Sequence, residues 1–144
     1  MTTIRDVMTA QPTFVSPDAT LATVARKMLD SDTGLMPIMD GPRLCGVITD
    51  RDIVVRAIAQ GADPTVTVAK DFCTTEVDTV SPDADVEAGI ALMEDHRIRR
   101  LVVMDGDRLV GVVSLGDLAI TFPDAAEDVL IEVSRSPKTL AHDV

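Results

Sequence analysis

The sequence predicts an α+β fold made from two copies of one β-α-β-β-α unit. The segment Val15-Ser16-Pro17-Asp18-Ala19 returns 65 residues later as Val80-Ser81-Pro82-Asp83-Ala84. The same offset relates further residues along both copies: Asp40-Gly41 to Asp105-Gly106, Gly46-Val47 to Gly111-Val112, Thr49 to Ser114, and Asp52 to Asp117. Within each copy, short apolar runs and turn residues alternate with segments of helical periodicity. Repetition in one register indicates a duplicated structural unit.

The duplication has a structural reason. A unit of about 55 residues buries too little apolar surface to be stable alone. We therefore expect the two units to pack sheet against sheet, with pseudo-two-fold symmetry. The predicted organisation is a first repeat over 1–60, a linker over 61–68, a second repeat over 69–124, and a C-terminal helix and tail over 125–144.

The first repeat begins with a short turn or helix over residues 4–9 and an extended segment over 13–15. Asp18 or Thr20 is placed to cap the following helix, in which Leu21, Val24, Ala25 and Met28 recur at helical spacing. Residues 36–39 and 44–48 form a predicted hairpin around the turn Asp40-Gly41-Pro42. Thr49 then caps a second helix, which reaches about Ala59.

The second repeat follows the same order. A short strand at 79–80 precedes a helix marked by Val86, Ile90 and Met93, and residues 101–104 and 109–113 form the hairpin. A last helix starts at Ser114, and Pro123 ends the copy. Residues 126–133 predict an additional helix, and the weakly patterned tail from Ser134 predicts frayed ends.

Composition limits the class of partner. The chain has 144 residues, 46% of them hydrophobic but only three aromatic, and a formal net charge of −11. This charge argues against nucleic acids and anionic membranes as partners, because both need a basic surface. We find neither an apolar run of membrane-spanning length nor a signal peptide, and two cysteines make neither a disulfide framework nor a zinc site. These features predict a cytoplasmic globular protein.

A hydroxyl and a carboxylate three residues apart stand where each hairpin meets its last helix: Thr49 with Asp52, and Ser114 with Asp117. One interpretation is a capping box, in which each side chain satisfies the other residue's backbone N–H. The other is a ligand site, in which the helix start and hydroxyl bind a phosphate and the carboxylate accepts from ribose hydroxyls. The two interpretations are compatible, because a cap can release its donors to a ligand.

A basic cluster, His96-Arg97-Ile98-Arg99-Arg100, precedes the second hairpin. It is either a solvated turn paired with local acids such as Glu94 and Asp95, or a site where Arg99 or Arg100 faces a ligand phosphate. The first repeat has Gly34 and Leu35 at the matching place, so the two sites would not be equivalent.

The sequence offers little to catalysis. Two histidines and two cysteines give no convincing nucleophile-and-base set, and we expect a protein that is not an enzyme. Cys45 matches Val110 and Cys73 matches Met8 in the other repeat, so both cysteines are expected to pack as small apolar residues.

These motifs together resemble a pair of cystathionine-β-synthase (CBS) domains, an arrangement called a Bateman module. The resemblance covers roughly residues 4–122. As a free-standing pair, the chain is similar to the small two-CBS proteins of actinobacteria. It rests on five stretches: Arg5-Asp6-Val7-Met8, Val-Ser-Pro-Asp-Ala, Gly34-Leu35-Met36-Pro37-Ile38, Leu44-Cys45-Gly46-Val47-Ile48-Thr49, and the Thr/Ser-x-x-Asp steps.

The resemblance implies a fold with two clefts between the repeats, a homodimer, and regulation of a separate partner protein through AMP, ADP, ATP or S-adenosylmethionine. Asp52 and Asp117 would hold a ribose, Thr49 and Ser114 would face a phosphate, and Arg100, within Arg99-Arg100-Leu101, would meet phosphate. The residues implied to surround the base are Phe14, Val15, Met36, Pro37, Thr79, Val80, Leu101 and Val102. The alternative is a homodimeric interaction protein of the stress response that binds no ligand.

Overall fold

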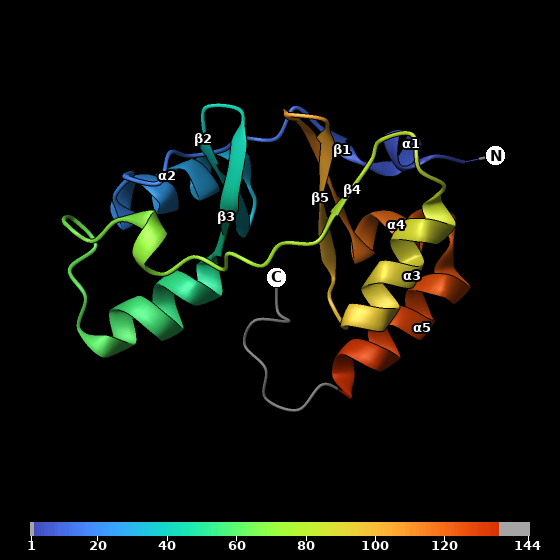
Figure 1. The fold of residues 1–144 in the computed structure, drawn as a ribbon. Helices are drawn as coiled ribbons and strands as arrows, with labels where there is room; N and C mark the ends of the chain where they lie inside the picture. The colour runs from blue at the N-terminus through green and yellow to red at the C-terminus, as the bar shows by residue number, and fades with distance from the viewer. Residues whose placement is uncertain (1, 136–144) are drawn as a thin grey trace. The chain divides into compact units, whose positions relative to one another are not determined.

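The computed structural model describes residues 2–135. The tail prediction for residues 136–144 lies outside the described residues. The chain forms two compact units, which are described one at a time (Figure 1). The first-repeat unit comprises residues 13–77, and the second-repeat unit comprises residues 2–12 together with 78–135.

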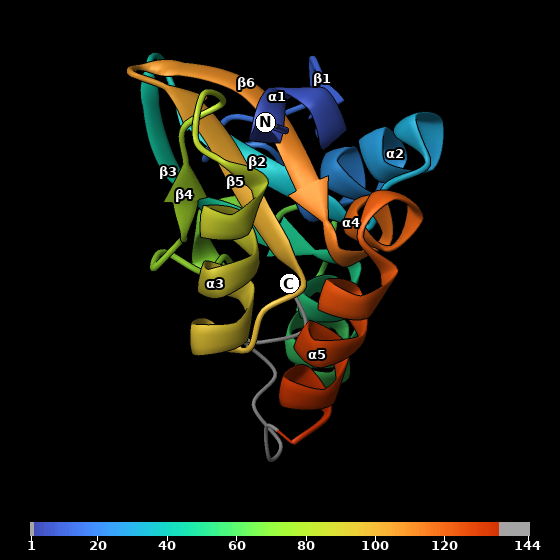
Figure 2. The same ribbon diagram turned by 90° about the vertical axis from the view of Figure 1, so that its right-hand side faces the viewer.

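The second-repeat unit contains a four-stranded sheet in the order β1-β6-β5-β4. The strands are β1 (Thr9–Ala10), β4 (Thr79–Val80), β5 (Arg100–Asp105) and β6 (Arg108–Ser114). The helices are α1 (Ile4–Val7), α3 (Val86–His96), α4 (Leu115–Thr121) and α5 (Pro123–Ser134). β5 and β6 form the predicted antiparallel hairpin, and β4 runs parallel to β5. Helices α3, α4 and α5 lie on one side of this sheet (Figure 2).

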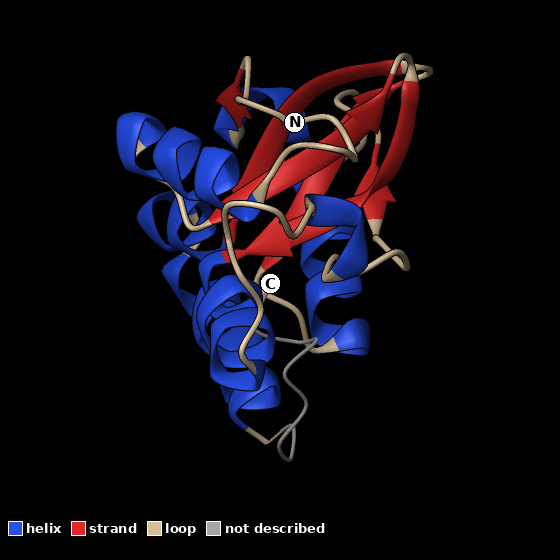
Figure 3. Ribbon diagram, turned by 90° about the vertical axis from the view of Figure 1, so that its left-hand side faces the viewer, coloured by secondary structure: helices blue, strands red, loops and turns tan. Residues whose placement is uncertain are grey.

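The first-repeat unit is built on the hairpin of β2 (Leu35–Asp40) and β3 (Arg43–Thr49). Val15 adds a single parallel bridge to Ile38, at the place that β4 occupies in the other unit. The helices are α2 (Leu21–Ser31), a wide π-type helix η1 (Asp52–Ala57), and two short 3₁₀ turns, η2 (Ile58–Gln60) and η3 (Ala69–Asp71). Figure 3 shows these helices beside the strands of the hairpin.

Each unit has its own aliphatic core. The core of the first-repeat unit contains Val15, Leu21, Val24, Met28, Met36, Ile38, Ile48, Ile53, Ala57 and Ala69. The core of the second-repeat unit contains Ile4, Val80, Val86, Met93, Ile98, Leu101, Val103, Val113, Leu118, Ala126, Val129 and Val133. Neither contains a buried aromatic ring, as the composition predicts, and burial of these side chains is the main favourable term for folding.

Local geometry repeats along with the sequence. α2 and α3 both end in a left-handed residue, Asp32 at φ 51° and Arg97 at φ 56°. Gly41 and Gly106 turn the two hairpins at φ 60° and 61°, a conformation that glycine adopts without steric cost. Both hairpins also carry an irregularity at the same point, after Ile38 and after Val103 respectively. The duplicated unit predicted from the sequence is therefore confirmed in backbone detail.

The segments that lead into the two repeats are exchanged between the units. In the second-repeat unit, Ile4 N donates to Ala84 O at 2.9 Å, and β1 pairs with β6. In the first-repeat unit, Val47 and Thr74 exchange backbone hydrogen bonds of 2.9 and 2.8 Å. Each compact unit thus contains the segment that precedes the other repeat. The repeat boundaries expected from the sequence, at residues 60 and 69, do not include this exchange, because the paired segments are far apart in sequence.

The other helices described here agree with the sequence predictions except for the residues at which they begin or end. Thr20 is the N-cap of α2, and its hydroxyl accepts from Thr23 N at 3.2 Å. The helix predicted over 126–133 is longer, because Pro123 lies at its first turn and begins α5.

Candidate functional site

The Ser114–Asp117 step lies where β6 ends and α4 begins. Asp117 N donates to Ser114 Oγ at 3.1 Å, and Ser114 N donates to Asp117 Oδ2 at 2.8 Å. The predicted capping box is therefore present. Both residues are half-buried, and within the described residues no protein donor is recorded for Asp117 Oδ1. One carboxylate oxygen holds the cap, and the other is left for a further donor.

The Thr49–Asp52 step has the same reciprocal bonds but a different environment. Thr49 N donates to Asp52 Oδ2 at 2.9 Å, and Asp52 N donates to Thr49 Oγ1 at 3.1 Å. Both residues are buried, with only 2% and 4% of their surface exposed. Arg56 Nη1 donates to Asp52 Oδ1 at 3.1 Å and to Phe72 O at 3.1 Å. Both oxygens of Asp52 thus have protein partners.

Arg56 was not among the site residues predicted from the sequence. The signal was available, because a cation four residues after a carboxylate on one helix lies on the same face. The contact with Phe72 O was not available, because it depends on the exchanged segment that contains η3.

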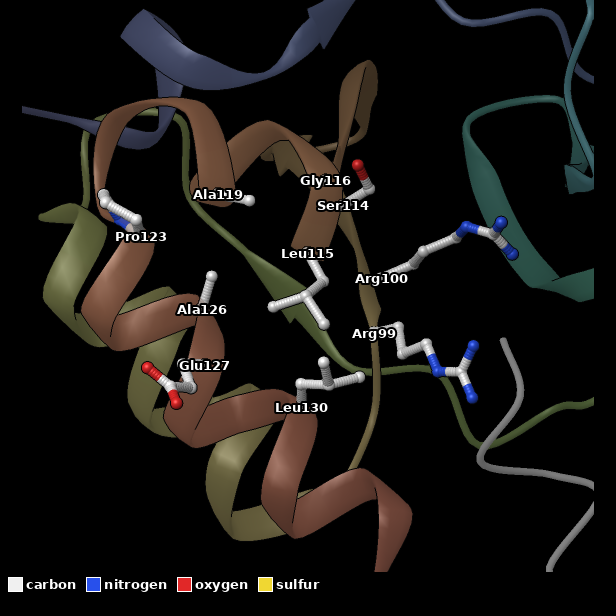
Figure 4. A pocket seen from close by; sticks show the side chains of 10 residues that line it. All are labelled: Arg99, Arg100, Ser114, Leu115, Gly116, Ala119, Pro123, Ala126, Glu127 and Leu130. Carbon is white, nitrogen blue, oxygen red and sulfur yellow. The ribbon is translucent and has the colours of Figure 1, made fainter.

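A cavity of about 590 Å³ lies in the second-repeat unit beside Ser114. Its basic edge is formed by Arg99, which is exposed, and Arg100, which is half-buried. Figure 4 shows these two arginines extending in the same direction, away from α5. The rest of the lining comes from α4 and α5: Leu115, Gly116, Ala119, Pro123, Ala126, Glu127 and Leu130. The cavity therefore joins a cationic edge and a hydroxyl to a wall that is apolar except for the carboxylate of Glu127.

The α5 side of this cavity was not predicted. The sequence showed an amphipathic segment at 126–133, but only packing against α4 turns part of that segment towards Ser114. In Figure 4 the side chains of Leu115, Ala126 and Leu130 gather between the two helices.

The remaining basic residues of the cluster pair with acids. His96 Nδ1 lies 2.7 Å from Asp78 Oδ1, and Arg97 Nε lies 4.0 Å from Glu132 Oε2 on α5. The partners are thus Asp78 and Glu132 instead of the adjacent Glu94 and Asp95. His96 and Arg97 therefore fit the interpretation of a solvated turn paired with acids. Arg99 and Arg100 instead line the cavity.

The other predicted site residues divide between the two units. Thr79 and Val80 form β4 and pair with Val102 and Val103, next to Arg100 on β5. Leu101 is 1% exposed and belongs to the core, so only its backbone is available near the cavity.

In the first-repeat unit, Val15 N donates to Pro37 O at 3.0 Å, which brings Val15 beside Met36 and Pro37. Phe14 is 51% exposed. The structure thus brings Arg99, Arg100 and Ser114 to one cavity, and places Asp117 within the same cap.

The cysteines pack as predicted. Cys45 and Cys73 are both partly buried against the core of the first-repeat unit. Burial raises the pKa of the Cys73 thiol above its ordinary value, and the nearby negative charge of Asp52 acts in the same direction.

Neither a membrane-spanning helix nor a cluster of metal ligands is present in the described part of the chain. Its helices are all too short or too polar to cross a membrane. Residues 2–135 also contain no group of three or more His, Cys, Asp or Glu side chains arranged to hold a metal ion.

The architecture defines a class of protein: two copies of a small α+β module, each with a hydroxyl–carboxylate step between its hairpin and its last helix. The family model of the CBS domain matches residues 4–58 and again 69–123. The chain therefore belongs to the CBS domain family, and the resemblance seen in the sequence is confirmed.

Relatives share this organisation along most of their length. The chain is 37% identical to Hypoxic response protein 1 of Mycobacterium tuberculosis over 142 residues, which cover 98% of this chain and 99% of the relative. It is 39% identical to the CBS domain-containing protein YhcV of Bacillus subtilis over 120 residues, 83% of this chain and 85% of the relative.

Solved structures are also similar. The crystal structure of Hypoxic Response Protein I, which carries two coordinated zinc ions, matches with a TM-score of 0.73 at 38% identity, covering 85% of this chain and all of the other. The CBS pair of protein MJ0100, in complex with 5′-methylthioadenosine and S-adenosyl-L-methionine, matches with a TM-score of 0.75 at 25% identity, covering 86% and 98%. The pair of CBS domains expected from the sequence is thereby shown.

Proposed function

We propose that this CBS pair is a non-catalytic sensor that binds an adenosine-containing ligand beside Ser114 and Asp117 and thereby regulates a separate partner protein. One observation carries the proposal. The cavity of the second-repeat unit joins Arg99, Arg100 and Ser114, and the cap at its edge leaves Asp117 Oδ1 without a recorded protein donor in the described chain.

The chemistry of these groups suits a nucleoside with an anionic substituent. A carboxylate oxygen can accept from the vicinal hydroxyls of a ribose. Guanidinium groups bind phosphate or carboxylate with charge-assisted hydrogen bonds, which are stronger than neutral ones. The chain has a net charge of −11, so an anion needs a place where the local charge is positive. The two adjacent arginines provide it.

The MJ0100 complex supports the choice of adenosine. Both of its ligands contain adenosine, and S-adenosylmethionine also carries a carboxylate. AMP, ADP and ATP offer phosphates to the same arginines. We take these four compounds as the candidate ligands.

We also propose a homodimer. Several large apolar side chains are exposed on helices of each unit: Val54, Val55 and Ile58 in the first-repeat unit, and Ile120, Leu130 and Ile131 in the second-repeat unit. Large apolar side chains that stay exposed on helices are candidates for a protein–protein surface. A second copy of the chain would cover them.

Isothermal titration of the purified protein with AMP, ADP, ATP and S-adenosylmethionine tests the ligand proposal. At least one compound should bind, and its 2′,3′-dideoxy analogue should bind at least tenfold more weakly, because the analogue lacks the hydroxyls that donate to Asp117. An unchanged affinity for the analogue would show that the ribose is not recognised. No binding by any of the four compounds would favour the interaction protein that binds no ligand.

A further inference from the structure

The two hydroxyl–carboxylate steps differ in one residue that the duplicated register makes comparable. Arg56 follows Asp52 by four positions, and the residue four positions after Asp117 is Thr121. Arg56 ties Asp52 Oδ1 to the carbonyl of Phe72 with two hydrogen bonds of 3.1 Å. Thr121 carries no charge and cannot form this ion pair.

The lead-in segments of the two repeats also correspond in register. The register places Val7 where the other repeat has Phe72, and α1, which contains Val7, contacts α4. An arginine at position 121 would stand four residues after Asp117, as Arg56 does after Asp52, and so on the same helix face as that carboxylate. Position 121 is therefore one difference between the two repeats, beside Gly34 and Leu35, which stand where the second repeat has Arg99 and Arg100.

Burial makes the ion pair hard to replace. The Asp52 side chain is 6% exposed, and the Arg56 side chain is 37% exposed. A buried carboxylate that loses its cation is left uncompensated, at a large cost in free energy. Ribose hydroxyls are neutral, so a nucleoside arriving at Asp52 would supply hydrogen bonds but no positive charge.

We infer that Arg56 masks Asp52, so that the chain binds one ribose-containing ligand, at Asp117, and keeps the equivalent site of the first repeat closed. This inference rests on the proposed function and adds the number of ligands that each chain binds. Arg56 is partly exposed and donates to Asp52 Oδ1, so it is the group that must leave before this oxygen can accept from a ribose. Loss of a charge-assisted hydrogen bond of this kind weakens binding by roughly one to two orders of magnitude.

Exchange of the two residues tests the inference. The variants are Arg56→Thr, which gives the first repeat the residue of the second, and Thr121→Arg, which does the reverse. Arg26→Thr removes an exposed arginine from α2 of the same unit and serves as the control for loss of charge. AMP and S-adenosylmethionine are each titrated by calorimetry, and folding of each variant is checked by circular dichroism.

The expected stoichiometry is one ligand per chain for the wild type and for Arg26→Thr, and two for Arg56→Thr. Thr121→Arg should lose at least tenfold in affinity at its single site while remaining folded. Two equivalent ligands on the wild type, or one on Arg56→Thr, would overturn the inference. If Arg56→Thr does not fold, Thr121→Arg decides: an unchanged affinity overturns the mask.

The outcomes separate the two proposals. If the wild type binds neither compound but Arg56→Thr binds one, the mask stands and the proposed site at Asp117 is wrong. If the wild type binds one ligand and both exchange variants behave as the wild type does, the proposed site stands and the mask is wrong. If no variant binds either compound, both are contradicted.

Discussion

Gly46 lies directly against the backbone of Thr74, so closely that a Cβ at position 46 would collide with the Thr74 carbonyl oxygen. Gly111 has the same relationship with the other exchanged segment, since its Cβ would lie 2.5 Å from Met8 Sδ and 2.9 Å from Thr9 O. Each hairpin thus admits the segment from the other repeat only because a glycine stands at the crossing.

Alanine at either crossing should therefore destabilise the protein. We expect Gly46→Ala and Gly111→Ala each to lower the free energy of unfolding by about 1–3 kcal/mol, the usual cost of overpacking. Urea unfolding followed by circular dichroism measures the effect. Gly116→Ala is the control, because its Cβ would meet only Ser114 Oγ, at 3.5 Å. Equal stability of all three variants would contradict the close crossing.

The cap of α4 gives a second prediction. Ser114→Ala removes the acceptor of Asp117 N and should lower the free energy of unfolding by about 0.5–2 kcal/mol. Ser114→Thr keeps the hydroxyl and should retain most of the wild-type stability. Thermal unfolding in the absence of ligand makes the comparison. A threonine variant as unstable as the alanine variant would show that the hydroxyl does not cap the helix.

The Cys73 thiol predicts a dependence on pH. Because burial raises its pKa in the folded state above the ordinary value of 9.0, the unfolded chain loses this proton at a lower pH than the folded chain does. Its contribution to stability is therefore full below pH 9 and decreases as the pH rises through the raised value. Cys73→Ala should show a smaller decrease in stability between pH 8 and pH 10 than the wild type, measured by urea unfolding. Identical pH profiles would contradict this assignment.

Alkylation provides an independent check of the same thiol. At pH 8, iodoacetamide should modify Cys73 more slowly in the folded protein than in urea, because only the thiolate reacts. Peptide mass spectrometry follows the modification. Equal rates in both states would show that the folded structure does not protect the thiol.

The homodimer predicts a mass of about twice 15.4 kDa in solution. Ile120, which is 87% exposed on α4, should be central to the interface, so Ile120→Glu should shift the protein towards the monomer. Leu29→Glu changes another exposed apolar residue, 75% exposed on α2, and is the control that should leave the dimer intact. Light scattering coupled to gel filtration measures both variants. A monomeric wild type at micromolar concentration would refute the dimer.

Much of the fold could be predicted because its signals are local. The repeat of Val-Ser-Pro-Asp-Ala, the helical periodicity from Leu21 to Met28 and the glycine turns of both hairpins depend only on neighbouring residues. The exchange of the leading segments could not be predicted in this way. Residues such as Thr9 and Thr74 carry no mark of which hairpin they will join.

In the candidate site, too, only the features with a local sequence signal could be predicted. Ser114 and Asp117 were found from their spacing, and the capping bonds are those that the spacing predicts. The cavity beside them depends on where α5 packs, and the closure of Asp52 depends on Phe72, sixteen residues after Arg56. Both are tertiary relationships, for which one sequence gives no direct signal.

The most direct test of the sensor is ligand-dependent thermal stability, measured with an extrinsic dye because the chain has neither Trp nor Tyr. A ligand at 100 times its dissociation constant adds about 2.7 kcal/mol, a rise of several degrees in Tm. We predict such a rise with at least one of AMP, ADP, ATP and S-adenosylmethionine, lost in Asp117→Asn and kept in Asp52→Asn. An unchanged Tm with all four compounds at millimolar concentration, or an equal rise in Asp117→Asn, would contradict an adenosine sensor at Asp117.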